Sequence, residues 1–167
     1  QLVAEPAVRF DFTHFEPVSP EQMQEIEALI NHKIMECIPV QNYEEDLDTA
    51  RKEGAMALFS EKYGDRVRVV KIGDYSMELC GGTHVKSTGE LGLFKVVSEA
   101  SVAAGVRRIE AVTGFGTLSM LDELRATLAQ SAAIVKSTPH ELPQRLTQLM
   151  AEVKDNAREI VMLNGRL

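Results

Sequence analysis

Two different residue periods divide this sequence, and the change from one to the other limits the folds that it can adopt. In the first part, four β-rich runs, "RVRVVKIGD", "YSMEL", "LGLFKVVSEAS" and "GVRRIEAVTG", follow one another with Gly, Asp and Thr between them. Over residues 142–167, apolar side chains instead recur at alternating spacings of four and three. The runs indicate a sheet, and the later repeat indicates packed helices. We therefore predict an α+β fold with a mostly antiparallel sheet and packed helices over residues 1–116, then a helical hairpin or coiled coil over residues 117–167.

The first 60 residues carry the signals of a strand and of a capped helix. "VRFDF" at 8–12 alternates apolar and charged side chains, which is the period of a strand. "SPEQ" at 19–22 combines a capping serine, a proline at the first helical position and a glutamine three residues after the cap. Apolar residues then recur at helical spacing as far as Cys37, and Pro39 is expected to end the helix. We predict that Cys37 is a buried core thiol, because free cysteine behaves as a small hydrophobe.

The carboxyl-terminal stripe contains one polar member, Asn156. A second apolar stripe over residues 118–135 precedes it, and "STPH" at 137–140 separates the two. Asn156 fixes the register of the packing if it lies in the seam, or rotates to the edge with Ala157 inside. Either arrangement is compatible with a homodimer formed through these helices.

Charge is unevenly distributed along this acidic chain, whose formal net charge is −7. Residues 1–60 carry 4 Lys or Arg against 12 Asp or Glu, whereas residues 61–116 carry 8 against 7. The first part is expected to repel nucleic acid, while the middle can approach it locally. There is no apolar run of the roughly 20 residues that cross a bilayer and no signal-peptide pattern at the start. We therefore expect a cytoplasmic protein with no membrane partner.

The stretch "LCGGTH" at 79–84 places a cysteine four residues before a histidine. Thiolate and neutral imidazole are ligands that zinc favours, and Gly81 and Gly82 let the backbone turn sharply close to a metal. Cys80 and His84 are therefore a candidate half of a zinc site. From the residues alone, a buried cysteine and a surface histidine beside a glycine turn explain the same pattern.

Five motifs, in the same order along the chain, resemble the editing domain of alanyl-tRNA synthetase. They are "VRFDFTHFE", "EGAMALFSEKYG", "ELCGGTH", "STGELGLFKVVSE" and "GVRRIEAVTG". Residues 1–116 are accordingly interpreted as part of an editing (second additional) domain, and residues 117–167 resemble the helical linker that follows it. "CGGTH" together with "GVRRIEAVTG" favours the alanyl enzyme or its free-standing relative over the threonyl enzyme, which shares the zinc pattern.

The resemblance implies a zinc site with a second ligand pair. In that family an H-x-x-x-H lies on a helix before the "RFDF" strand, and this sequence contains no H-x-x-x-H. Cys80 and His84 would then need two further ligands from upstream, and this segment alone is expected to bind zinc weakly. The resemblance also implies that ATP and magnesium are used elsewhere in the full-length enzyme.

The substrate implied by the resemblance is an alanine tRNA mischarged with serine or glycine, whose ester bond is hydrolysed. Gly81, Gly82 and Thr83 lie beside the ligands and are candidate substrate contacts, although a role of Thr83 in stabilising the turn is the favoured explanation for that residue. Arg107 and Arg108 alternate faces on a regular strand, so one is expected to contact tRNA phosphate and the other to pair with a carboxylate such as Glu99 or Glu110. We predict that Arg107 faces substrate.

A second interpretation assigns this segment to an interaction module instead of an enzyme. The 3.5-residue repeat alone describes a helical dimerisation or interaction module. In that case Cys80 and His84 are structural, and this segment has no activity of its own.

Overall fold

The computed structural model describes residues 1–4, 7–57 and 64–165. The chain divides into two compact units, Gln1–Thr117 and Leu118–Leu167, and each is described by itself. The motif "EGAMALFSEKYG" reaches into residues 58–63, so that part of it lies outside the described residues.

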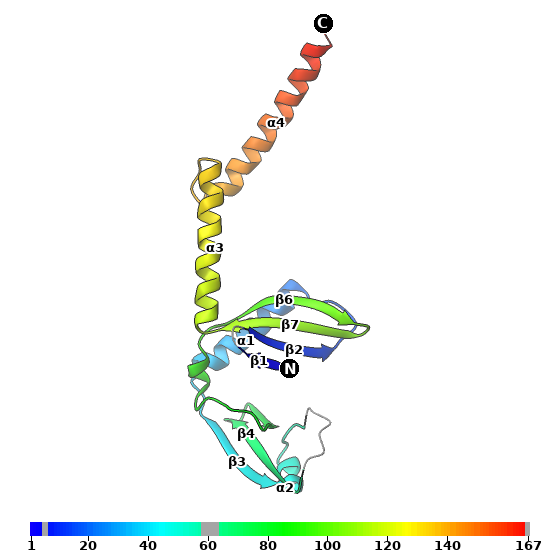
Figure 1. Cartoon of the computed structure of the whole chain (residues 1–167), viewed down its shortest axis with the longest axis vertical. Helices are drawn as coiled ribbons and strands as arrows, with labels where there is room; N and C mark the ends of the chain where they lie inside the picture. Colours follow the sequence, from blue (N-terminus) through cyan, green and yellow to red (C-terminus); the bar gives the residue numbers. More distant parts are fainter. Residues whose placement is uncertain (5–6, 58–63, 166–167) are drawn as a thin grey trace. The chain divides into compact units, whose positions relative to one another are not determined.

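The first unit contains a four-stranded antiparallel sheet with the strand order β1-β2-β7-β6. Its strands are β1 (Leu2–Ala4), β2 (Ala7–Thr13), β6 (Phe94–Ala103) and β7 (Val106–Thr113). Figure 1 shows β6 and β7 side by side as a hairpin, with β2 along the other edge of β7. The predicted alternation of β2 is confirmed, because Phe10 and Phe12 stack on one face while Asp11 pairs with Arg108 on the other.

A second, three-stranded antiparallel sheet has the order β3-β4-β5. It contains β3 (Val40–Asp46), β4 (Arg66–Ile72) and β5 (Ser76–Leu79), with the short helix α2 (Leu47–Lys52) between β3 and β4. Five buried residues form its core: Ala50, Ala55, Val67, Val69 and Leu79. β4 is therefore central, and β5 leads from this core directly into Cys80.

Helix α1 (Pro20–Met35) begins as predicted and ends earlier than predicted. Ser19 accepts a hydrogen bond from the Gln22 backbone, and the Gln22 side chain bonds back to the Ser19 backbone, which completes a capping box. The helix stops before Cys37, whose φ of 51° is left-handed. Cys37 is exposed, so the prediction of a buried core thiol is wrong: its backbone has already left the helix and its apolar face.

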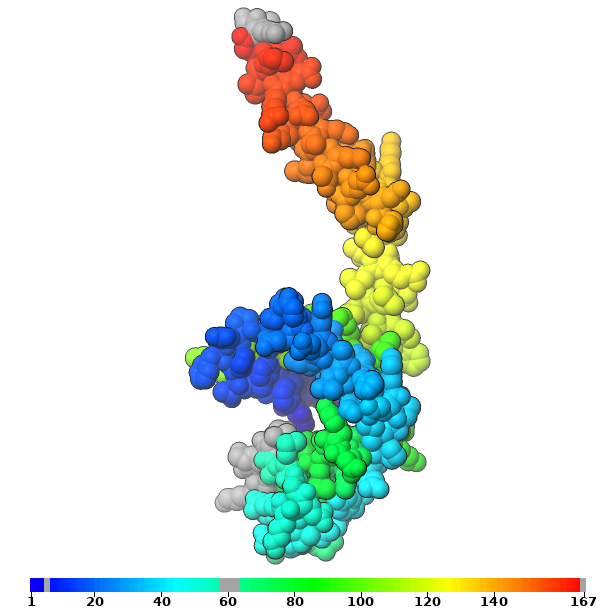
Figure 2. Space-filling view, turned by 180° about the vertical axis from the view of Figure 1, so that it is seen from behind, coloured from blue at the N-terminus to red at the C-terminus, as the bar shows by residue number. Residues whose placement is uncertain are grey.

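The contact between α1 and the first sheet is polar. β6 is an edge strand, and its outward backbone groups at Phe94 bond to the Asn31 side chain, both as donor and as acceptor. The backbone N–H of Val96 donates to Glu27 at 2.7 Å, and Lys95 pairs with the same carboxylate. Glu27 is consequently buried, while Leu29 on the apolar stripe of the helix stays 50% exposed. Figure 2 shows α1, in blue, at the surface of this unit.

The second unit consists of two helices. α3 (Phe115–Ile134) starts at the end of the first unit, and α4 (Leu142–Asn164) follows a short turn. Arg145 of α4 donates a hydrogen bond to the Val135 carbonyl just after α3. Both predicted helices are confirmed, as is the α+β class. Ala132 and Leu142 near the turn are buried. Most residues of the two apolar stripes are exposed: Leu118, Leu121, Leu124 and Leu128 on α3, and Leu146, Val153, Ile160 and Leu163 on α4. In the described part of the chain, no helix has the length and apolarity to cross a membrane.

Candidate functional site

The position of Cys80 is fixed by the second sheet. Leu79, the last residue of β5, is only 4% exposed in the core. The backbone N–H of Cys80 then donates to the carbonyl of Arg68 on β4 at 3.1 Å, which extends the β4–β5 ladder by one residue. Cys80 is half-buried as a result, and its thiol leaves the sheet at a defined place.

The Cys80 thiol and the His84 ring both lie close to Gly82. A Cβ placed on Gly82 would lie 3.6 Å from Cys80 Sγ and 3.8 Å from His84 Nε2, so both atoms approach the same point. His84 Nε2 is buried and has no hydrogen-bond partner in the described residues. A buried polar nitrogen without a partner is uncommon, and a missing ligand is one of its standard explanations. The structure thus places both predicted ligand atoms beside Gly82, and their role as zinc ligands stays a prediction.

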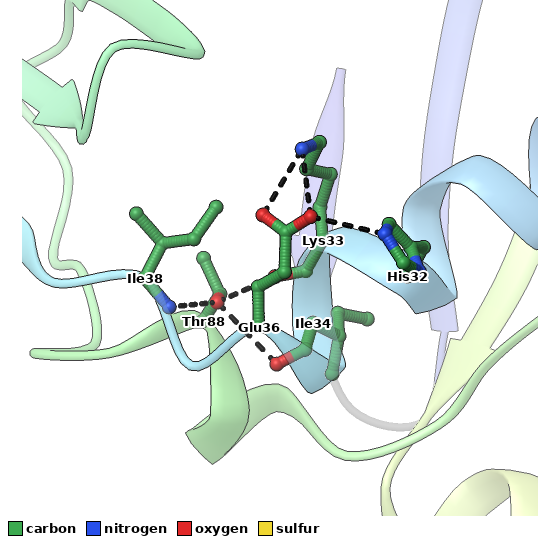
Figure 3. Close-up of polar contacts among 6 residues, drawn as sticks. All are labelled: His32, Lys33, Ile34, Glu36, Ile38 and Thr88. Atoms are coloured by element: carbon green, nitrogen blue, oxygen red, sulfur yellow. Dashed lines mark hydrogen bonds and ion pairs between the residues drawn. The ribbon is translucent and has the colours of Figure 1, made fainter.

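The downstream end of this loop is attached to α1 and β3. Figure 3 shows the centre of the attachment, the buried hydroxyl of Thr88 in the short 3₁₀ helix η1 (Thr88–Leu91). This hydroxyl donates to the Lys33 carbonyl at 2.7 Å and accepts from the Ile38 backbone at 2.9 Å. The Val40 N–H also donates to the Lys86 carbonyl. Both ends of the segment from Cys80 to Thr88 are thus held by backbone hydrogen bonds.

The predicted substrate residues divide into two groups. Gly81, Gly82 and Thr83 are exposed on the loop between the two candidate ligands. Arg107, in contrast, is 9% exposed and forms a two-point ion pair with Glu99. One of the two arginines was expected to pair with a carboxylate such as Glu99. In the structure that arginine is Arg107, the residue that we predicted to face substrate.

Arg108 is also paired. It forms a two-point ion pair with Asp11, with both N–O distances at 2.7 Å. Hydrogen bonds from these arginines hold the pKa of Glu99 and of Asp11 below their usual values. Neither arginine has its charge free for a ligand in this structure.

Arg68 lies beside the candidate pair and was not predicted from the sequence. Its side chain is exposed, and its Nη1 lies 3.5 Å from the Gly81 carbonyl. The alternation in "RVRV" indicates that Arg66 and Arg68 share a face of the strand. That this face also carries Cys80 depends on the β4–β5 register, for which the sequence gives no signal.

The described residues supply two candidate metal ligands at this place. Among them, no group of three or more His, Cys, Asp or Glu side chains is close enough to hold a metal ion. A soft thiolate and an imidazole that converge beside a glycine are chemically suited to zinc, which takes three or four protein ligands. The residues present therefore fit half of a zinc site.

Comparison with known proteins identifies the family. Residues 67–110 match the family model described as the threonyl and alanyl tRNA synthetase second additional domain. The chain is 51% identical over 166 residues to the alanine–tRNA ligase of Pelotomaculum thermopropionicum, 52% to that of Geobacillus kaustophilus and 49% to that of Bacillus subtilis. Each match covers 99% of this chain and 19% of the relative.

The chain belongs to the alanyl-tRNA synthetase family. It spans about a fifth of the length of these curated alanyl-tRNA synthetases, which are named as enzymes that join alanine to tRNA. The family model covers β4, β5 and most of the β6–β7 hairpin, and so includes both Cys80 and His84.

Proposed function

We propose that this segment forms part of a proofreading site in an alanyl-tRNA synthetase, where serine or glycine wrongly attached to the alanine tRNA is removed by hydrolysis. The observation that carries the proposal is the convergence of Cys80 Sγ and the unpartnered His84 Nε2 beside Gly82. This pair lies inside the region that matches the second additional domain. The parent enzyme attaches alanine to its tRNA with ATP and magnesium, which act outside this segment.

A second, hydrolytic site is needed because the alanine pocket of the synthetase has limited selectivity among small amino acids. A pocket for alanine cannot strongly exclude the smaller glycine, and serine differs from alanine by a single hydroxyl. Discrimination by one small group is worth only about 1–3 kcal/mol, which is less than accurate protein synthesis requires. A separate site that hydrolyses the wrong ester supplies the missing discrimination.

Cys80 and His84 would hold zinc together with two ligands from outside this segment. When bound, zinc supplies a Lewis acid that activates water or holds the amino or adenosine end of the substrate. The residues of the chain itself position this centre: the β4–β5 ladder fixes Cys80, and the Thr88 hydroxyl fixes the loop after His84.

The exposed loop residues are suited to contact the aminoacyl end of the substrate. Gly81 and Gly82 leave the backbone open to close approach because they have no side chains. Thr83 lies between the two candidate ligands in the sequence, and its hydroxyl is a candidate hydrogen-bond partner for a serine hydroxyl. Arg107 is held by its ion pair with Glu99. A direct contact of Arg107 with the substrate requires that ion pair to open.

The test uses the full-length synthetase that carries this segment. Zinc content and hydrolysis of seryl-tRNA are measured for Cys80→Ala and His84→Ala, with Cys37→Ala as the matched control because Cys37 is the other cysteine and is exposed. We expect the first two variants to lose zinc from this site and most hydrolysis while alanine attachment is retained. Full hydrolysis in both variants would refute the proposal.

We also propose that α4 mediates self-association. Its apolar stripe is exposed, as shown by Leu146, Val153 and Ile160, which are 45%, 61% and 58% exposed. A stripe repeating every 3.5 residues matches the seam of a coiled coil, for which a second copy of the same helix is a suitable partner.

A further inference from the structure

Arg68 and Cys80 are opposite neighbours on adjacent antiparallel strands. The β4–β5 ladder pairs Val69 with Leu79, and the hydrogen bond from Cys80 N–H to the Arg68 carbonyl continues it by one pair. Residues directly opposite in an antiparallel pair project to the same face, with Cβ atoms about 5 Å apart. The guanidinium and the thiol therefore leave the sheet side by side.

The guanidinium of Arg68 is available for a ligand. Among the described residues, its side chain hydrogen-bonds only to the Gly81 carbonyl, at 3.5 Å, which is at the outer limit of a hydrogen bond. Within residues 1–4, 7–57 and 64–165 it makes no ion pair, although Glu44 lies opposite it on β3. The Glu44 carboxylate is instead 3.7 Å from Arg66.

Arg68 differs in this respect from the arginines of β7. Arg107 and Arg108 each use two nitrogens on one carboxylate, which neutralises their charge inside the first sheet. Arg68 keeps its donors exposed at the loop that carries Cys80 and His84. Of these three arginines, Arg68 is the one that lies beside the candidate pair and forms no ion pair with a described residue, so it is the one suited to bind an anionic ligand.

We infer that Arg68 binds a backbone phosphate near the 3′ end of the tRNA substrate. The inference rests on the proposed function, in which the ester at the terminal adenosine lies beside Cys80 and His84. The negative charges nearest to such an ester are the phosphates of the last nucleotides. A planar guanidinium binds phosphate through two parallel hydrogen bonds, and such contacts set the register of a nucleic acid on a protein.

The test compares Arg68→Ala, Arg68→Lys and Arg66→Ala in the full-length synthetase. Arg66 is the matched control because it is an exposed arginine on the same face of β4, two residues away, and is close to Glu44. Steady-state hydrolysis of seryl-tRNA gives KM and kcat. Binding of uncharged tRNA at several salt concentrations gives the salt dependence, and melting temperature and zinc content report whether each variant is folded and loaded.

We expect Arg68→Ala to raise KM about tenfold with kcat within about twofold of wild type, the size of a lost charge-assisted contact. The slope of log K against log salt should fall by about 0.7, the value of one phosphate contact on a single strand. Arg68→Lys should keep the slope and show an intermediate KM, because it keeps the charge and loses the two-point geometry. Arg66→Ala should match wild type in both.

Suppose that the wild-type enzyme hydrolyses seryl-tRNA and that Arg68→Ala changes neither KM nor the salt dependence of tRNA binding. This result would overturn the inference about Arg68 and leave the proposed function unaffected. An equal effect of Arg66→Ala would also overturn it, because it would show only general attraction. If the wild-type enzyme hydrolyses no seryl-tRNA, the proposed function fails and the tRNA-binding slope alone decides the role of Arg68. If Arg68→Ala does not fold, the KM of Arg68→Lys decides, and a wild-type value would refute two-point binding.

Discussion

Arg107 on β7 and Glu99 on β6 form a two-point ion pair between diagonal neighbours of the hairpin, with Arg107 Nη2 2.7 Å from Glu99 Oε2. Their side chains are only 10% and 11% exposed, whereas those of the Arg108–Asp11 pair are 30% and 35% exposed. The sheet therefore contains two arginine–carboxylate pairs that differ in burial.

Glu99→Gln should lower the melting temperature by several degrees more than Asp11→Asn. Removing the carboxylate charge leaves Arg107 as an unpaired cation at a site with little solvent, while Arg108 can recover its hydration. Thermal unfolding followed by circular dichroism measures both changes. Equal shifts in the two variants would show that burial does not distinguish the pairs.

The same carboxylate predicts a pH dependence. Arg107 holds the folded pKa of Glu99 below its ordinary 4.5, so the pair stabilises the fold fully above that pH. The contribution is lost as pH falls below 4.5 through the folded pKa. The stability difference between wild type and Glu99→Gln should therefore be constant from about pH 7 to pH 5 and shrink towards pH 3. A difference that grows on acidification would contradict the assignment.

Thr88→Val should destabilise the first unit by about 1–2 kcal/mol, because the Ile38 N–H loses its acceptor while the side-chain shape is kept. Ser131→Ala removes an exposed hydroxyl that bonds within α3 and is the control, with an expected change under about 0.5 kcal/mol. Urea unfolding measures both free energies. A negligible effect of Thr88→Val would mean that water replaces the hydroxyl.

Val153→Glu should abolish self-association through α4, because it places a charge on the exposed apolar stripe. Gln148→Glu adds the same charge to α4 off that stripe and should leave association unchanged. Sedimentation equilibrium at micromolar concentrations gives the oligomeric state of each. A monomeric wild-type chain would refute the proposed role of α4.

Features encoded within a few neighbouring residues could be predicted from the sequence. The capping box at Ser19 and the alternation of β2 need only local spacing, and both are confirmed. The approach of Cys80 and His84 to Gly82 also depends only on a short loop, because the two residues are four positions apart in the sequence.

Features that depend on tertiary contacts could not be predicted. The helical period assigned Cys37 to a buried face, but the chain turns left-handed there and exposes the thiol. The same period favours burial of Leu29, whereas the contact with β6 is made by Glu27 and Asn31. The place of Arg68 beside Cys80 depends on strand register, which side-chain patterning leaves open.

The polar contact of α1 with β6 has a consequence for how this protein stays separate from others in a concentrated solution. An exposed edge strand offers unpaired N–H and C=O groups to any extended peptide, and this is a common start of aggregation. Asn31 and Glu27 occupy those groups at Phe94 and Val96, as a neighbouring strand would. Two side chains of one helix thus block strand addition at the first residues of this edge.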